Sequence, residues 1–134
     1  MNVKEALAAD QWRGAIEFSI EERSPERVVA KMPIQPGIIN AFGTVHAGAL
    51  IWFADVAATL CAVDSPDAVD EDGHGFPLAV DLHTVLIGNE RDGILTAESK
   101  PVRRGRTLIV IRTIVTGPTG KQLIDMTTTH MAAR

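Results

Sequence analysis

The side chain with the clearest chemical potential is Asp55, which lies inside the most apolar run of this 134-residue chain, from Ala47 to Val63. A carboxylate in apolar surroundings needs hydrogen-bond partners, because burial otherwise penalises its charged form and raises its pKa. Such a carboxylate is a candidate general base or nucleophile. The alternative is a structural Asp that bonds a hydroxyl or backbone group where helices meet, and Asp55 alone does not decide between the two.

A polar, glycine-containing loop leads into this run, with the sequence Asn40-Ala41-Phe42-Gly43-Thr44-Val45-His46-Ala47-Gly48. The first N–H groups of a helix lack intrahelical acceptors, and together with the helix dipole they suit an oxyanion. Asn40 could add an amide donor, and His46 could orient the loop or polarise a carbonyl. Taken singly, a turn role for Asn40 and a capping or core role for His46 are the simpler interpretations. The combination of loop, helix start and carboxylate favours a catalytic site.

The elements around these residues read as one long helix among strands. The run from Ala47 to Val63 is apolar on every side, which predicts a helix that is buried on all sides. Alternation and enrichment in Val, Ile and Thr predict strands at residues 16–21, 27–34, 77–87, 93–102, 107–116 and 121–131. Residues 3–12 favour a short helix, residues 22–25 a hairpin turn, and short links favour antiparallel pairing of consecutive strands. We therefore expect a single α+β domain over residues 1–134, an antiparallel sheet around one helix.

The composition excludes several classes of protein. Apolar residues make up 46% of the chain, enough for a core without metal or disulfide cross-links. A net charge of −4, with only 4% aromatic residues and no Tyr, argues against nucleic-acid binding. The single cysteine, Cys61, fits a reducing compartment, and Asp55 at the centre of the apolar run argues against a membrane span. We expect a soluble, cytoplasmic protein that binds neither nucleic acid nor membrane.

Metal ligation is not expected from the sequence. The four histidines, His46, His74, His83 and His130, are scattered without paired ligand spacing. The acidic stretch over residues 64–75 resembles a calcium loop in composition only, because the EF-hand spacing is absent.

The loop and helix resemble the PaaI-type acyl-CoA thioesterases of the hotdog fold, in the superfamily typified by 4-hydroxybenzoyl-CoA thioesterase. That family's signature is an Asn-x-x-Gly-x-x-His-Gly-Gly loop before a helix that carries Asp, and here Asp55 follows His46 by nine residues. Residues 78–84 and 102–108 are similar to the family's third strand and its Gly-Arg/Lys-Thr strand start. The resemblance extends from about residue 12 to the C-terminus. It implies the hotdog fold, an antiparallel β-sheet wrapped around one long buried helix.

The resemblance implies a role for each residue of the motif. Asp55 would be the nucleophile or the general base for water, and the backbone N–H of Ala47 would polarise the thioester carbonyl. Asn40 would help to place the carbonyl or the water, and His46 would support the loop and contact the thioester. The site of such proteins forms between two subunits, so Asp55 would face the loop of a partner in a homodimer or a homotetramer built as a dimer of dimers.

Three positions depart from the family pattern. Ala47 stands where Gly is common, and it keeps the N–H donor provided that its φ is not positive. Ala79 stands where some relatives carry a Ser or Thr whose hydroxyl holds the attacking water. Here that water would have to be held by another side chain, either Thr84 or His83. Asn89 stands where Pro is frequent, which we interpret as a loop difference.

A basic cluster in this acidic chain comprises Lys100, Arg103, Arg104 and Arg106. It would clamp the phosphates of coenzyme A or, alternatively, form a solvated strand edge guarded by charge. The substrate-binding residues expected from the resemblance are Gly48, Trp52, Ala79, His83, Thr84, Arg103, Arg104, Gly105 and Arg106.

The predicted function is hydrolysis of an acyl- or aryl-CoA thioester to the free acid and CoA, without a cofactor. The acyl chain would lie along the apolar helix near Trp52. One alternative is a hydratase or dehydratase on the same fold, with His46 and Asp55 as acid and base. Another is a domain that binds acyl-CoA without turnover. The sequence does not fix the identity of the acyl chain.

Overall fold

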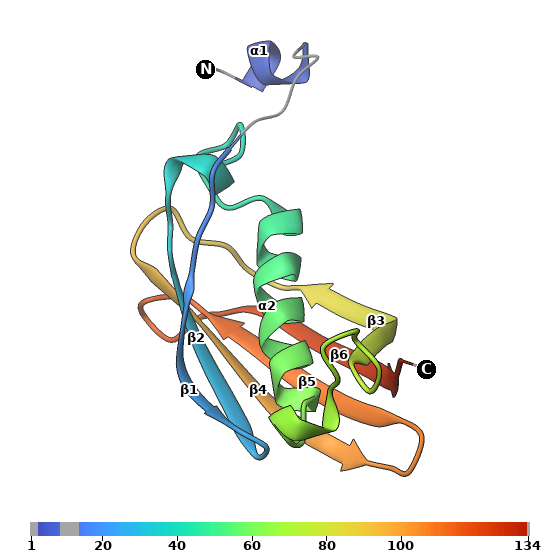
Figure 1. The fold of residues 1–134 in the computed structure, drawn as a ribbon. Coiled ribbons are helices and arrows are strands. Elements are labelled where there is room, and N and C mark those ends of the chain that lie inside the picture. Colours follow the sequence, from blue (N-terminus) through green and yellow to red (C-terminus); the bar gives the residue numbers. More distant parts are fainter. Residues whose placement is uncertain (1–2, 9–13, 134) are drawn as a thin grey trace.

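The computed structural model describes residues 3–8 and 14–133, in which a six-stranded antiparallel sheet packs against one long helix (Figure 1). The predicted α+β architecture is confirmed. The long helix is α2 (Ala47–Ala62), and the strands are β1 (Ser19–Ser24), β2 (Arg27–Pro33), β3 (Pro77–Leu86), β4 (Ile94–Arg104), β5 (Ile109–Thr116) and β6 (Gln122–Ala132). Three short helical segments complete the described chain: α1 (Val3–Leu7), η1 (Pro36–Ile38) and η2 (Pro66–Ala68).

The strand order is β1-β2-β4-β5-β6-β3, with every neighbouring pair antiparallel. Pairing of consecutive strands is confirmed for β1 with β2 and for β4, β5 and β6. It is wrong for β3, which pairs with β6 at the edge of the sheet. The reason is that α2 carries the chain across the sheet to its far edge, and the link over residues 87–93 then returns it so that β4 lies beside β2. As a result, β3 is an edge strand next to the helix.

The N-terminal boundaries differ from the expected ones. Strand β1 begins at Ser19 and runs to Ser24, and the turn that joins it to β2 is formed by Pro25 and Glu26. The expected turn over residues 22–25 is therefore shifted, because residues 22–24 continue the ladder with β2. The helix expected over residues 3–12 is observed over Val3–Leu7, and residues 9–13 lie outside the described part of the chain.

Small residues let α2 lie close to the sheet. Ala54, Ala57 and Ala58 are fully buried against the strands, with Leu50 and Phe53 filling the space beside them. Burial on all sides is wrong for the single chain: Trp52 is 38% exposed. One sheet can cover only one face of a helix, so the remaining apolar surface of α2 is only partly covered.

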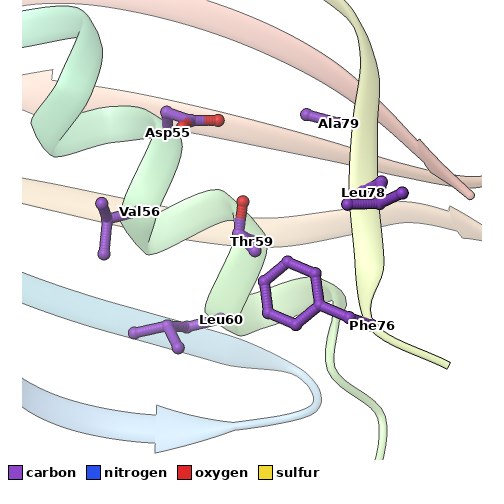
Figure 2. Close-up of a pocket in the computed structure, with 7 residues that line it drawn as sticks. All are labelled: Asp55, Val56, Thr59, Leu60, Phe76, Leu78 and Ala79. Carbon is purple, nitrogen blue, oxygen red and sulfur yellow. The ribbon is translucent and has the colours of Figure 1, made fainter. Parts of the chain in front are cut away.

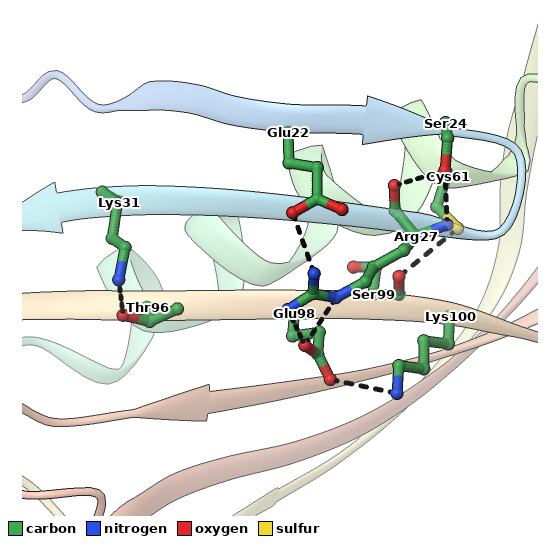
Figure 3. Close-up of polar contacts among 9 residues, drawn as sticks. All are labelled: Glu22, Ser24, Arg27, Lys31, Cys61, Thr96, Glu98, Ser99 and Lys100. Atoms are coloured by element: carbon green, nitrogen blue, oxygen red, sulfur yellow. Dashed lines mark hydrogen bonds and ion pairs between the residues drawn. The ribbon is translucent and has the colours of Figure 1, made fainter.

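The opposite face of the sheet carries a row of ion pairs across β1, β2 and β4 (Figure 3). The Arg27 guanidinium lies 2.8 Å from Glu22 and 2.6 Å from Glu98, and Lys100 lies 3.4 Å from Glu98 on its other side. An antiparallel sheet commonly has one face on the core and one in solvent. The polar face is thus separated from the chemistry on the helix side.

Candidate active site

Asp55 lies in a pocket between α2 and the start of β3 (Figure 2). The cavity has a volume of about 340 Å³. Its lining consists of Asp55, Val56, Thr59 and Leu60 from α2 and Phe76, Leu78 and Ala79 from the β3 side. Figure 2 shows the Asp55 carboxylate directed across this space toward Ala79. Apart from Asp55 and Thr59, the side chains around the pocket are apolar.

The Asp55 carboxylate has hydrogen-bonding capacity to spare. Its Oδ1 atom is buried and has no hydrogen-bond partner among the residues that the structure describes. The alternative of a structural Asp bonded to a hydroxyl or backbone group therefore finds no bond to support it at this atom. A buried acceptor without a donor is costly, so Oδ1 is suited to accept a proton or hydrogen bond from water or a bound ligand.

Thr59 is a polar residue of this pocket that is absent from the site residues expected from the sequence. It follows Asp55 by one helical turn, at the i, i+4 spacing that puts two side chains on the same face. Ala79 lines the pocket as well, whereas the two residues considered as its substitutes, His83 and Thr84, are not among the lining residues. The spacing of Asp55 and Thr59 was the available signal for a hydroxyl near the carboxylate.

Asn40 organises the loop that precedes α2. Its Oδ1 accepts hydrogen bonds from the backbone N–H groups of Phe42 at 2.9 Å and Thr44 at 3.1 Å. Its Nδ2 donates to Thr44 Oγ1 at 2.9 Å and to the carbonyl of Val45 at 3.3 Å. Both ends of the amide are thus engaged inside the loop, which gives Asn40 a demonstrable part in the loop's shape.

The start of α2 presents backbone donors. The carbonyl of His46 accepts the N–H groups of Ala49 and Leu50 at 3.1 and 3.2 Å. Ala47 and Gly48 are exposed, and their N–H groups meet no acceptor in the described chain. Ala47 has no positive φ, so the methyl group at this position leaves its donor intact.

The two parts of the candidate site are far apart within one chain. Ala47 and Asp55 are separated by eight residues on α2, which corresponds to about 12 Å along the helix axis. A nucleophile and a donor that act on one carbonyl group must each lie about 3 Å from it. A single chain therefore carries two half-sites, the Asp55 pocket and the helix start, that cannot serve the same carbonyl.

The basic cluster divides into members with different roles. The Arg104 guanidinium donates to the carbonyls of Cys61 at 2.6 Å, Ala62 at 3.2 Å and Pro25, so that it caps the C-terminus of α2. Arg103 and Arg106 are exposed, and the described residues provide no ion-pair partner for either. Gly105 lies between them, where its N–H donates to the Leu108 carbonyl at 2.8 Å.

Two further ring-bearing residues are related to Asp55: Trp52 precedes it by three residues on α2, and His130 lies close enough for a charge interaction. The Trp52 ring packs edge to face on Phe18, with centroids 4.7 Å apart. His130 is fully buried on β6, where its Nδ1 donates to the Pro77 carbonyl at 3.1 Å and its Nε2 accepts from Thr128 at 2.8 Å. Burial lowers the pKa of His130, partly offset by the Pro77 carbonyl and by Asp55. In the sequence, His130 is only one of four scattered histidines, and no spacing marks it as part of the site.

The acidic loop brings three potential metal ligands together. Ligand atoms of Asp70, Asp72 and His74 lie within 4.8 Å of one another, and all three residues are exposed. Asp72 and His74 already pair at 2.8 Å. The sequence does not predict a metal site here. The ion pair between Asp72 and His74 occupies two of the three candidate ligands, so we do not assign a metal site.

Comparison with known proteins identifies the family. No family model matches the sequence. The chain is 30% identical over 96 residues to the putative esterase ComA2 of Bacillus subtilis, which covers 72% of this chain and 73% of that protein. The Staphylococcus aureus thioesterase SAV0944 superposes with a TM-score of 0.80 at 24% identity, covering 89% of this chain and 95% of that one. A hypothetical thioesterase from Streptococcus pneumoniae, solved with coenzyme A, has a TM-score of 0.76 at 20% identity, covering 87% and 86%.

The fold is thus the hotdog fold, and the chain belongs to the PaaI-type thioesterases of the hotdog superfamily, as its loop and helix indicated. Among the described residues, no helix is long and apolar enough to cross a membrane.

Proposed function

We propose that this protein is an acyl-CoA thioesterase that hydrolyses an acyl- or aryl-CoA thioester to the free acid and CoA. The observation that carries the proposal is the buried Oδ1 of Asp55, which has no hydrogen-bond partner within the described chain, in an otherwise largely apolar pocket of about 340 Å³. Membership in the thioesterase family supports it, as does the coenzyme A bound to the pneumococcal relative.

In the proposed mechanism, the acyl group occupies the Asp55 pocket and the thioester oxygen accepts a hydrogen bond from the N–H of Ala47. Asp55 either attacks the carbonyl carbon or takes a proton from the water that attacks it. Thr59 is placed to hold that water. The C–S bond then breaks, and CoA leaves as the thiol after it receives a proton, from Asp55 if water attacked or from water if Asp55 attacked. In the second route, water then hydrolyses the acyl-Asp55 anhydride, which releases the free acid and regenerates the carboxylate.

The same mechanism requires two copies of the chain, because Ala47 and Asp55 of one helix cannot reach one carbonyl. Pairing of β3 with β3 of a second copy about a twofold axis would place the two α2 helices antiparallel and side by side. The start of each helix would then approach the middle of the other. We propose that each active site combines Asp55 from one subunit with the loop from Asn40 to Gly48 of its partner.

Arg103 and Arg106 are proposed to contact the phosphates of coenzyme A, since both are exposed cations without a partner in the described chain. The Arg104 guanidinium already donates hydrogen bonds to carbonyls at the end of α2. Its contribution to substrate binding would be indirect, through the placement of its two neighbours.

The test is a thiol-release assay over short, long and aryl acyl-CoA esters, with Asp55→Asn as the diagnostic variant. This change preserves shape and removes the base, so we expect the rate to fall by about 10³-fold or more. Asp67→Asn, an exposed residue of the acidic loop, is the matched control and should keep the wild-type rate.

Three results would contradict the proposal. Full activity in Asp55→Asn would remove the carboxylate from the mechanism. Exchange of deuterium at the α-carbon without CoA release would indicate a hydratase or dehydratase. Thermal stabilisation by acyl-CoA with no thiol produced would indicate a binding protein.

A further inference from the structure

The side chain of Asn89 forms a two-point contact with the backbone just before α2. Its Oδ1 accepts a hydrogen bond from the N–H of Val45 at 3.0 Å, and its Nδ2 donates to the carbonyl of Val45 at 2.8 Å. The amide thereby imitates the backbone of a neighbouring strand. Val45 is two residues from Ala47, whose N–H is the proposed donor to the thioester.

Val45 depends on this contact. It is completely buried, and within the described chain its N–H has no acceptor other than Asn89. On its other side it forms an isolated bridge with Ile39, flanked by bonds from Asn40 N–H to the Thr44 carbonyl at 2.7 Å and from His46 N–H to the Ile38 carbonyl at 2.8 Å. Without the Asn89 amide, a buried backbone donor would be left unsatisfied at the entrance to α2.

The segment that carries Asn89 is held against the sheet, because the N–H groups of Ile87 and Gly88 donate to the Leu123 carbonyl of β6 at 3.0 and 3.4 Å. The Asn89 carbonyl accepts a hydrogen bond from Lys121 Nζ at 3.1 Å, and the Asn89 Oδ1 also accepts the N–H of Glu90 at 2.8 Å. The preceding residue, Gly88, fits so closely against β6 that an added Cβ would lie 2.7 Å from the Gln122 carbonyl. These contacts link the position of β6 to that of the loop before α2.

Arg91 makes a second link between the same two segments. Its Nη1 donates to the Phe42 carbonyl at 2.7 Å. Two side chains of the segment that follows β3 therefore hold the backbone of the loop before α2, one at its tip and one at its end.

We infer that Asn89 is a positioning residue for thioester hydrolysis: its amide holds Val45 so that the N–H groups at the start of α2 point at the substrate carbonyl. The inference rests on the proposed function and adds a residue that touches neither substrate nor water. It also gives the Asn at this position a purpose, where the sequence suggested only a loop difference.

Kinetics of Asn89→Leu and Asn89→Asp test the inference. Asn89→Leu removes both contacts at similar size, and we expect kcat to fall about 10- to 100-fold with KM changed by less than about threefold, since a displaced donor acts on the transition state. In Asn89→Asp, an ionised carboxylate faces the Val45 carbonyl, whereas the protonated acid restores one donor and one acceptor. An aspartic acid with its usual pKa of about 3.9 stays ionised at both pH 8 and pH 5, so the rate relative to wild type should be low at both.

Ser99→Ala serves as the control for a general loss of stability. Ser99 and Thr113 form a buried hydroxyl pair at 2.6 Å inside the sheet, so that this variant also leaves a buried polar group unpaired. Its kcat should stay within about twofold of wild type. Hydrogen exchange provides a readout independent of turnover: the Val45 amide should lose protection in Asn89→Leu while amides of β5 keep theirs.

Wild-type kcat in Asn89→Leu, unchanged hydrogen-exchange protection of the Val45 amide in that variant, or wild-type kcat in Asn89→Asp at pH 8 would overturn this inference alone. Absence of thiol release by the wild type would instead overturn the proposed function.

Discussion

Asp55 and Thr59 differ in how visible they are in the sequence, although they share one pocket. Asp55 stands out because a carboxylate is rare in an apolar run and demands an explanation. Thr59 does not, since a hydroxyl on a half-buried helix is commonplace and its meaning depends on what lies opposite. Only the packing of α2 against the start of β3 shows that Thr59 faces the same cavity as Asp55. The carboxylate of the site could be predicted from the sequence, whereas the i, i+4 spacing of Thr59 only placed a hydroxyl on the same helix face, and the fold was needed to show that this face lines the pocket.

Thr59→Val tests the role of that hydroxyl. The two side chains have nearly the same shape, so we expect kcat to fall about 10-fold, because the attacking water loses a hydrogen bond, with KM nearly unchanged. Steady-state kinetics of thiol release measure both values.

Thr84→Val is the matched variant. Thr84 Oγ1 is buried without a partner in the described chain, so replacing it removes an unsatisfied group and should leave stability unchanged or slightly raised. If Thr84→Val lost activity and Thr59→Val kept it, the hydroxyl helper would be Thr84.

His130 predicts a pH dependence of stability. Burial lowers its pKa in the folded protein, so the unfolded chain binds a proton first as the pH falls below about 6.5. Folding stability should therefore decrease from about pH 7 downward, and His130→Gln should remove this part of the decrease. Urea unfolding midpoints between pH 5 and 8 measure it.

The ion-paired carboxylates Glu98 and Asp125 do not add to the change in stability expected between pH 5 and 8. Their Arg partners lower the pKa values of Glu98 and Asp125, so the stability that these pairs add is lost only at more acidic pH. The same slope in wild type and His130→Gln would show that His130 does not titrate as described.

At the level of elements, the sequence predicts the long helix and the strands well, because periodicity and composition are local properties. The strand order could not be predicted in this way. Whether β3 pairs with β4 or with β6 depends on how α2 crosses the sheet, which involves contacts far apart in the chain. The sequence therefore does not predict that β3 lies at the edge of the sheet. Nor does it predict where the Asp55 pocket lies, because β3 forms one side of that pocket.

Arg104 connects two elements, and its replacement should lower the stability of the fold. It joins the end of α2 to the β1–β2 turn through three carbonyls. We expect Arg104→Gln to lower the free energy of unfolding by about 1–3 kcal/mol, because half-buried carbonyls lose a charged donor. Urea denaturation monitored by circular dichroism measures the change.

Arg103→Gln is the control for this prediction. Because the Arg103 side chain is exposed, Arg103→Gln should change the free energy of unfolding by less than about 0.5 kcal/mol. The KM of this variant for acyl-CoA should rise, and the rise should become smaller as salt is added. Equal destabilisation by the two variants would argue against a special role for Arg104 in holding α2.

The whole molecule has two sheet edges of very different character. Strand β1 is short and carries Glu21, Glu22 and Arg23, which discourage pairing with another chain. Strand β3 is longer, and five of its apolar residues are 42–55% exposed: Leu78, Val80, Leu82, Val85 and Leu86. A long apolar edge is a template for strand addition. The apolar side of α2 that the sheet leaves uncovered lies on the same flank, so one contact could cover both.

Assembly through β3 is tested by Leu82→Lys combined with Leu86→Lys. We expect the wild-type chain to sediment as a dimer or as a dimer of dimers, and the double variant as a monomer without thioesterase activity although Asp55 is intact. Val102→Lys is the control, because Val102 is 62% exposed on β4, away from this edge. A monomeric, fully active double variant would contradict a site shared between subunits.

Mixed subunits give the most direct test of a shared site. Asp55→Asn removes the carboxylate and should be nearly inactive alone, whereas Asn89→Leu disturbs the helix start and should keep about 1–10% of the wild-type rate. In a mixed dimer, one site receives both defects and the other receives neither. Random exchange makes about half of the dimers mixed, so activity should recover to about a quarter of wild type after co-refolding equal amounts. Sites contained within single chains would give no recovery, because every chain would still carry one of the two defects.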